Sequence, residues 1–225
     1  MKIVLFDIDG TLLHSGGAGK AAMEFALRQT YAIENILETV SYSGRTDQAI
    51  SHDLLTVHGV EPTDQNRKRL CRAYLNALPE KLLAYTTLLC PGIPELLACM
   101  RDHPDVALGL LTGNAVEGAR LKLAHVGLWD YFSFGGYGDV HFERDEVARD
   151  ALRNAITAIP VAGESHEVYV IGDTPLDVRC ARAIGAKAVA VATGWHELAE
   201  LEACRPDLCY RDLSDTAQFL RDIGM

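Results

Sequence analysis

Short apolar runs alternate along this chain with segments of helical periodicity. Near-continuous apolar runs that end at a polar residue or a glycine indicate buried strands. Such runs occur at residues 2–6, 106–111, 167–172, 186–193 and, more weakly, 207–210. Helical patterning lies between them, at residues 93–102, 115–126, 145–158, 175–184 and 214–222. Buried strands separated by helices predict an α/β fold in which helices cover both faces of a parallel central sheet.

One long segment, residues 15–87, breaks this alternation. It contains no convincing strand, only apolar positions at helical spacing such as Ile50, Leu54 and Leu55. We therefore expect an all-helical insert directly after the first strand. The insert opens with SGGAGKA, which departs from the phosphate-binding P-loop pattern at both ends. Its clustered glycines are more typical of a hinge.

Net charge and cysteine usage narrow the possible partners. The formal charge of −10 argues against nucleic-acid binding, which depends on clustered lysine and arginine. It leaves a small anionic substrate possible, because a bound cation can reverse the local field. No apolar run approaches membrane-spanning length, and the six cysteines show neither C-x-x-C nor zinc spacing. We expect a cytoplasmic protein, a monomer or homodimer, without a membrane or nucleic-acid partner.

Polar side chains gather where the predicted strands end. Ligands of open α/β sheets bind beyond the carboxyl ends of the strands. Each group taken alone could be a helix cap or a turn. Together they would place like charges at one sheet edge, and carboxylates repel unless a cation such as Mg²⁺ compensates them. The residues concerned are Asp7, Asp9, Thr112, Gly113, Asn114, Asp173 and Asp177.

Three of these stretches resemble a known family. FDIDGTL (6–12), LLTGN (110–114) and VIGDTPLDV (170–178) are similar to the first, second and fourth motifs of the haloacid dehalogenase superfamily of phosphohydrolases. The resemblance implies a Rossmann-like core, residues 1–14 and 88–225, with a small all-helical cap domain over residues 15–87. It also implies a Mg²⁺-dependent phosphatase that acts on a small phosphorylated metabolite, phosphoglycolate phosphatase-like in layout.

The resemblance also implies roles for the strand-end residues. Asp7 would be the nucleophile that forms an aspartyl-phosphate, and Asp9 the general acid–base. Asp7, Asp173 and the backbone carbonyl of Asp9 would bind the metal, with Asp177 in or just behind that shell. The phosphoryl oxygens would be bound by Thr112, Gly113 and Asn114.

The third motif of the family matches less well. Its usual lysine is replaced by Arg144, which stands 32 residues after Thr112. An arginine can neutralise the nucleophile and the phosphoryl group with a permanently charged fork. Lys122 is the alternative cation, but its place within the predicted helix 115–126 favours a solvated surface lysine. In the insert, SGRTDQAI (43–50) resembles the cap loop that faces the active site, so Arg45 could meet a substrate anion.

Two other functions stay open at this point. A phosphomutase of the same superfamily would share every core motif. A non-catalytic phosphate-binding regulatory module would keep the fold without turnover. The presence of both Asp7 and Asp9 argues against the second alternative, because binding alone needs no acid–base.

Overall fold

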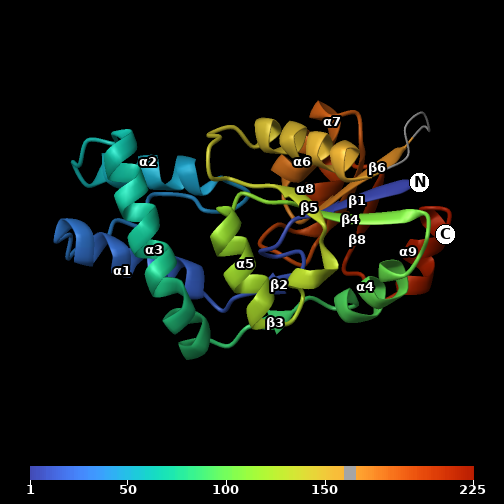
Figure 1. The fold of residues 1–225 in the computed structure, drawn as a ribbon, viewed down its shortest axis with the longest axis horizontal. Coiled ribbons are helices and arrows are strands. Elements are labelled where there is room, and N and C mark those ends of the chain that lie inside the picture. The colour runs from blue at the N-terminus through green and yellow to red at the C-terminus, as the bar shows by residue number, and fades with distance from the viewer. Residues whose placement is uncertain (160–165) are drawn as a thin grey trace.

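A six-stranded parallel sheet forms the centre of the protein. The computed structural model describes residues 1–159 and 166–225 (Figure 1). The strand order confirms the predicted α/β fold with its parallel, Rossmann-like sheet. From one edge to the other the strands are β5 (Phe134–Gly136), β4 (Val106–Leu111), β1 (Lys2–Phe6), β6 (Glu167–Gly172), β7 (Lys187–Val191) and β8 (Leu208–Tyr210).

Helices cover both faces of this sheet. Successive side chains of a strand point to opposite faces, so Val4 and Phe6 of β1 pack into one apolar core while Ile3 and Leu5 pack into the other. The first core is closed by α4 (Ile93–Arg101), α5 (Val116–His125) and α9 (Thr216–Asp222). The second core is closed by α6 (Arg144–Ala158), α7 (Pro175–Ala183) and α8 (Leu198–Ala203).

The helical unit, residues 18–84, lies to one side of the sheet (Figure 1). It consists of α1 (Ala18–Tyr31), α2 (Asp47–Val57) and α3 (Asp64–Ala84), which bury a third apolar core among themselves. Two short strands, β2 (Leu13–His14) and β3 (Leu88–Leu89), pair antiparallel where the chain leaves and re-enters the sheet domain. The strands fall at the ends of the predicted insert, and the division of the chain into two domains stays a prediction.

Several short elements were not predicted. The pair β2 and β3, the strand β5, the helix α8 and a 3₁₀ turn at Trp129–Tyr131 are too short for periodicity to reveal. None of the helices in residues 1–159 and 166–225 is long and apolar enough to span a bilayer.

The edge strand β5 carries a glycine for a packing reason. A Cβ at Gly136 would lie 2.2 Å from the backbone oxygen of Val147 and 2.9 Å from the Cβ of Ala151, both in α6. Helix α6 therefore packs directly on the strand backbone, and this contact fixes the position of the first residue of the helix, Arg144.

We predict that Gly136→Ala lowers the free energy of unfolding by about 1–3 kcal/mol, as overpacking against backbone atoms does. Gly118→Ala, within helix α5, is the matched control, because a Cβ there would lie at an ordinary 3.5 Å from the side chain of Leu75. Because alanine favours a helix more than glycine does, the free energy of unfolding of that variant should be unchanged or higher by up to about 1 kcal/mol. Urea denaturation followed by circular dichroism measures both, and equal stability of Gly136→Ala and wild type would contradict the packing argument.

Candidate active site

A cavity of about 760 Å³ opens at the carboxyl ends of β1, β4 and β6, between the sheet and the helical unit. This is the sheet edge at which ligands of α/β proteins bind. The sheet domain lines it with Asp7, Asp9, Gly113, Asn114, Lys122, Arg144 and Asp173, and the helical unit and its connections contribute residues that include Gly17, Tyr42, Arg45 and Asp47. Most of the strand-end residues singled out in the sequence thus meet around one space.

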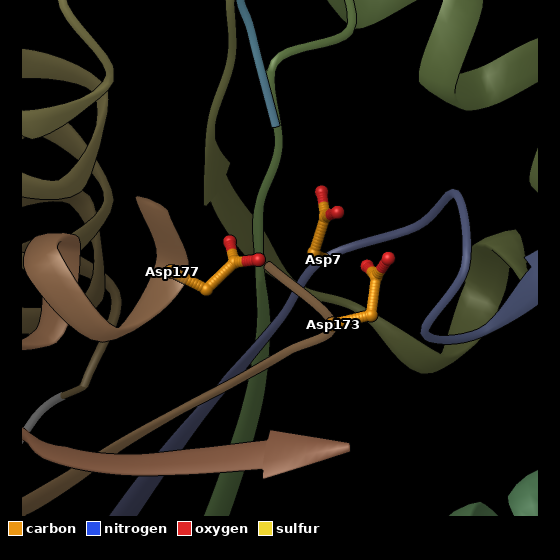
Figure 2. A group of neighbouring side chains, drawn as sticks. All are labelled: Asp7, Asp173 and Asp177. Atoms are coloured by element: carbon orange, nitrogen blue, oxygen red, sulfur yellow. The ribbon is translucent and has the colours of Figure 1, made fainter. Parts of the chain in front are cut away.

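Three buried carboxylates form an acidic cluster beside this cavity. Asp7, Asp173 and Asp177 each offer an oxygen, and these oxygens lie within 4.8 Å of one another (Figure 2). Asp7 and Asp173 line the cavity, and Asp177 lies behind them with its carboxylate directed toward Asp7. Thr11 stabilises the cluster by donating a hydrogen bond of 3.0 Å from its hydroxyl to Asp173 Oδ1.

The start of α7 holds Asp177 in place. Thr174 is the N-cap of this helix and Pro175 follows it, so the chain turns sharply from β6 into the helix. Asp177 Oδ2 accepts hydrogen bonds from the backbone nitrogen of Thr174 at 3.0 Å and from its hydroxyl at 2.7 Å. The DTPLD stretch is therefore both a capping box and a part of the acidic cluster.

Arg144 compensates the charge of this cluster from the first turn of α6. Its Nη2 lies 2.9 Å from Asp7 Oδ1 and 2.6 Å from Asp177 Oδ1, and its side chain is 3% exposed. Burial alone would lower the pKa of the guanidinium, but Asp177 and Asp7 outweigh it and raise that pKa. Burial raises the pKa of Asp7, and Arg144 opposes this increase. One arginine therefore bridges two of the three clustered carboxylates.

Asp9 belongs to a separate polar group on the same cavity. Lys122 Nζ lies 2.6 Å from Asp9 Oδ2, and Asn114 Nδ2 donates to the same oxygen at 2.8 Å. Lys122 also donates to Asn114 Oδ1 at 2.7 Å. Burial tends to raise the pKa of Asp9, but Lys122 and Asn114 outweigh this effect and lower it.

The prediction that Lys122 is a solvated surface lysine was wrong. Its side chain is only 6% exposed, because α5 faces the helical unit and contacts α3 rather than solvent. A signal was present in the sequence. The buried face of this segment runs through Ala115, Ala119 and Leu123, and Lys122 lies three residues after Ala119 on the same side.

Comparison with known proteins shows the family. The model of the haloacid dehalogenase-like hydrolase family matches residues 1–185. The chain belongs to this family. It is 29% identical over 223 residues to a phosphoglycolate phosphatase from Synechococcus elongatus, covering 97% of this chain and 96% of the relative.

Solved structures of other proteins share the fold along the whole chain. A hydrolase from Pseudomonas syringae superposes with a TM-score of 0.74 at 24% identity and full coverage of both chains. A putative β-phosphoglucomutase from Bacteroides vulgatus gives a TM-score of 0.71 at 20% identity, covering 99% of this chain and 88% of its own. At these identities the likeness concerns the fold alone.

In this hydrolase the polar end of the LLTGN stretch lies only partly on the cavity. Gly113 and Asn114 line the cavity, whereas Thr112 is fully buried next to them. The hydroxyl oxygen of Thr112 accepts a hydrogen bond of 2.8 Å from Asn114 Nδ2. Thr112 thus orients the asparagine that contacts Asp9.

The helical unit is in direct contact with this loop. The backbone nitrogen of Asp47 donates to the Gly113 carbonyl at 2.7 Å, and Asp47 Oδ2 accepts from the backbone nitrogen of Ala115 at 2.8 Å. A Cβ at Gly113 would lie 2.0 Å from the Arg45 carbonyl, so only glycine fits there. Burial raises the pKa of Asp47 to about 6. Thr46 caps α2, and Asp47, the first residue of that helix, makes this second contact.

Arg45 lies on the cavity wall. Its Nη2 pairs with Asp53 Oδ2 at 2.7 Å, and its Nη1 donates to the Ser41 carbonyl at 3.3 Å. The guanidinium is therefore held by the helical unit itself.

The acidic cluster fits a hard divalent cation. Burial raises the pKa of Asp173 well above its ordinary value, and the nearby Asp7 and Asp177 raise it further. Arg144 contacts Asp7 and Asp177, which leaves Asp173 with only the Thr11 hydroxyl among its side-chain partners in the described ranges. Carboxylate oxygens in such an arrangement are the ligands that Mg²⁺ prefers.

We predict that Arg144→Met lowers the free energy of unfolding by about 3–5 kcal/mol at mildly alkaline pH, because it leaves buried carboxylates without their cation. The loss should shrink under acidic conditions, where those carboxylates can take up protons. Arg179→Met is the control. Its exposed ion pairs with Glu143 and Asp145 should contribute less than about 1 kcal/mol. A pH-independent loss for Arg144→Met, measured by chemical denaturation, would contradict the electrostatic explanation.

Proposed function

We propose that this hydrolase is a Mg²⁺-dependent phosphatase that cleaves a small phosphomonoester through an aspartyl-phosphate intermediate. The observation that carries the proposal is the separation of Asp7 and Asp9. They line one cavity, but Asp7 is paired with Arg144 and Asp9 with Lys122. Two carboxylates in different environments can take different roles, one as a nucleophile and one as an acid–base. Membership of the family and the similarity to named phosphatases support the same assignment.

In the first half-reaction a carboxylate oxygen of Asp7 attacks phosphorus. The bond from phosphorus to the leaving oxygen breaks, and Asp9 gives that oxygen a proton. In the second half-reaction Asp9 takes a proton from water, which attacks the aspartyl-phosphate. Phosphate leaves and Asp7 is restored.

The phosphoryl group would be held by the loop after β4 and by Arg144. The backbone amide of Gly113 is the candidate donor to its oxygens, and Arg144 would neutralise the charge that the phosphoryl oxygens share with Asp7. The sequence also suggested Thr112 and Asn114 as donors, but Thr112 is buried beside the cavity and Asn114 Nδ2 donates to Asp9 and Thr112. Asp7, Asp173 and the backbone carbonyl of Asp9 would hold Mg²⁺, with Asp177 behind them. Bound there, Mg²⁺ would offset the charge of the carboxylates and the phosphate.

The leaving group would lie against the helical unit. The similarity to phosphoglycolate phosphatases favours a small phosphorylated acid as the substrate, and Arg45 is the candidate partner for its anionic group. Arg45 would have to exchange its contact with Asp53 for the substrate. Cytoplasmic location and a monomeric or homodimeric state stay predictions.

The first functional prediction concerns the nucleophile. Asp7→Asn should reduce phosphate release from an aryl phosphate by several powers of ten, because an amide has the same shape but does not attack phosphorus. Asp64→Asn, at an exposed carboxylate of the helical unit, is the control and should keep wild-type turnover. Turnover of Asp7→Asn near the wild-type rate would contradict the mechanism. Transfer of the phosphoryl group to an added sugar phosphate without phosphate release would indicate a mutase.

The second functional prediction concerns the metal. EDTA should abolish activity and Mg²⁺ should restore it, whereas Ca²⁺ should inhibit because its looser shell misplaces the attacking carboxylate. Asp173→Asn should raise the Mg²⁺ concentration for half-activation by roughly 10-fold or more. Full activity of metal-free enzyme, checked by elemental analysis, would contradict the proposed cation site.

A further inference from the structure

Lys122 is hydrogen-bonded to Asp9 and Asn114, and the proposed reaction gives this lysine no role of its own. A buried ammonium ion is costly unless it is paired and hydrogen-bonded. Lys122 meets this condition with two oxygens, Asp9 Oδ2 at 2.6 Å and Asn114 Oδ1 at 2.7 Å. It reaches them from the last turn of α5, on the wall of the cavity.

The hydrogen bonds to Asp9 all fall on one of its two oxygens. Lys122 and Asn114 both donate to Oδ2, and Asn114 is itself held by Thr112. Among the residues that the structure describes, no group donates to Oδ1. The side chain of Asp9 is 41% exposed toward the cavity, so Oδ1 is the oxygen that can meet a ligand.

We propose that Lys122 is a positioning residue that, together with Asn114, fixes Oδ2 of Asp9 and thereby aims Oδ1 at the leaving oxygen of the substrate. This inference rests on the proposed phosphatase function. Lys122 acts on the proton donor, whereas Arg144 acts on the nucleophile, so the two buried cations serve different reacting groups.

The consequence depends on the leaving group. As the phosphorus–oxygen bond breaks, the proton on Asp9 Oδ1 passes to the leaving oxygen, and Asp9 keeps the electron pair of its broken O–H bond. An alkoxide is a poor leaving group and needs this proton. A nitrophenolate is stable as an anion and leaves without it. A misaligned Asp9 therefore slows the first half-reaction much more for alkyl esters than for nitrophenyl esters, whereas the second half-reaction is the same for both.

The test compares Lys122→Met with wild type on an alkyl phosphate and on p-nitrophenyl phosphate, both with saturating Mg²⁺. We expect the first-turnover rate for the alkyl ester, measured before the steady state, to fall by roughly 10²-fold or more, the usual contribution of a general acid. Release of nitrophenolate in the first turnover should change only a few-fold, and the ester concentration that gives half of the maximal first-turnover rate should stay near the wild-type value for both. Arg120→Met removes the same charge from the exposed face of α5 and should affect neither ester.

Equal losses of the first-turnover rate with both esters, or a large rise in the half-saturating ester concentration, would overturn the proposal and show that Lys122 binds the phosphoryl group itself. Wild-type enzyme that hydrolyses neither ester would instead refute the proposed function.

A second variant guards against a folding defect, because Lys122→Met leaves Asp9 without its cation. Asp9→Asn/Lys122→Met removes both charges and is compared with Asp9→Asn alone. Once the donor is gone, loss of Lys122 should not change the ratio of alkyl to nitrophenyl activity. A further drop of that ratio in the double variant would contradict the positioning role.

Discussion

Electrostatic repulsion at one edge of the sheet is the constraint on which the rest of this structure depends. Asp7, Asp173 and Asp177 are buried with oxygens less than 5 Å apart, and Asp9 lies on the same cavity. Carboxylates so placed cannot all ionise without compensation. Two buried cations supply part of it: Arg144 between Asp7 and Asp177, and Lys122 beside Asp9.

Both cations reach the cavity from helices that follow strands of the sheet. Helices α5 and α6 follow the neighbouring strands β4 and β5. Arg144 is the first residue of α6 and Lys122 lies in the last turn of α5, and both line the cavity. Close packing fixes their positions: Gly136 lets α6 rest on the strand backbone, and the buried face of α5 carries Lys122 inward. The helical unit completes the arrangement, because Asp47 joins the Gly113 loop to the start of α5.

The sequence was sufficient to predict the sheet, most of its strands and the residues at their carboxyl ends. Continuous apolar runs identify buried strands, and topology brings their ends together. The sequence was insufficient to predict the burial of Lys122, because a single charged residue on a mixed helix looks solvated until the element that covers it is known. Asp47 was missed in the same way. Its hydrogen bond to Ala115 joins residues 68 positions apart, and local pattern does not reveal such a contact.

The central claim is that Asp7 becomes covalently phosphorylated while Asp9 handles protons, and trapping the intermediate tests it most directly. Asp9→Asn enzyme is mixed with Mg²⁺ and p-nitrophenyl phosphate, whose leaving group needs no proton, and the reaction is quenched in acid. Without its base the second step is slow, so peptide mass spectrometry should find one added phosphoryl group on Asp7. Nitrophenolate release with no adduct, or with an adduct on another residue, would contradict the account.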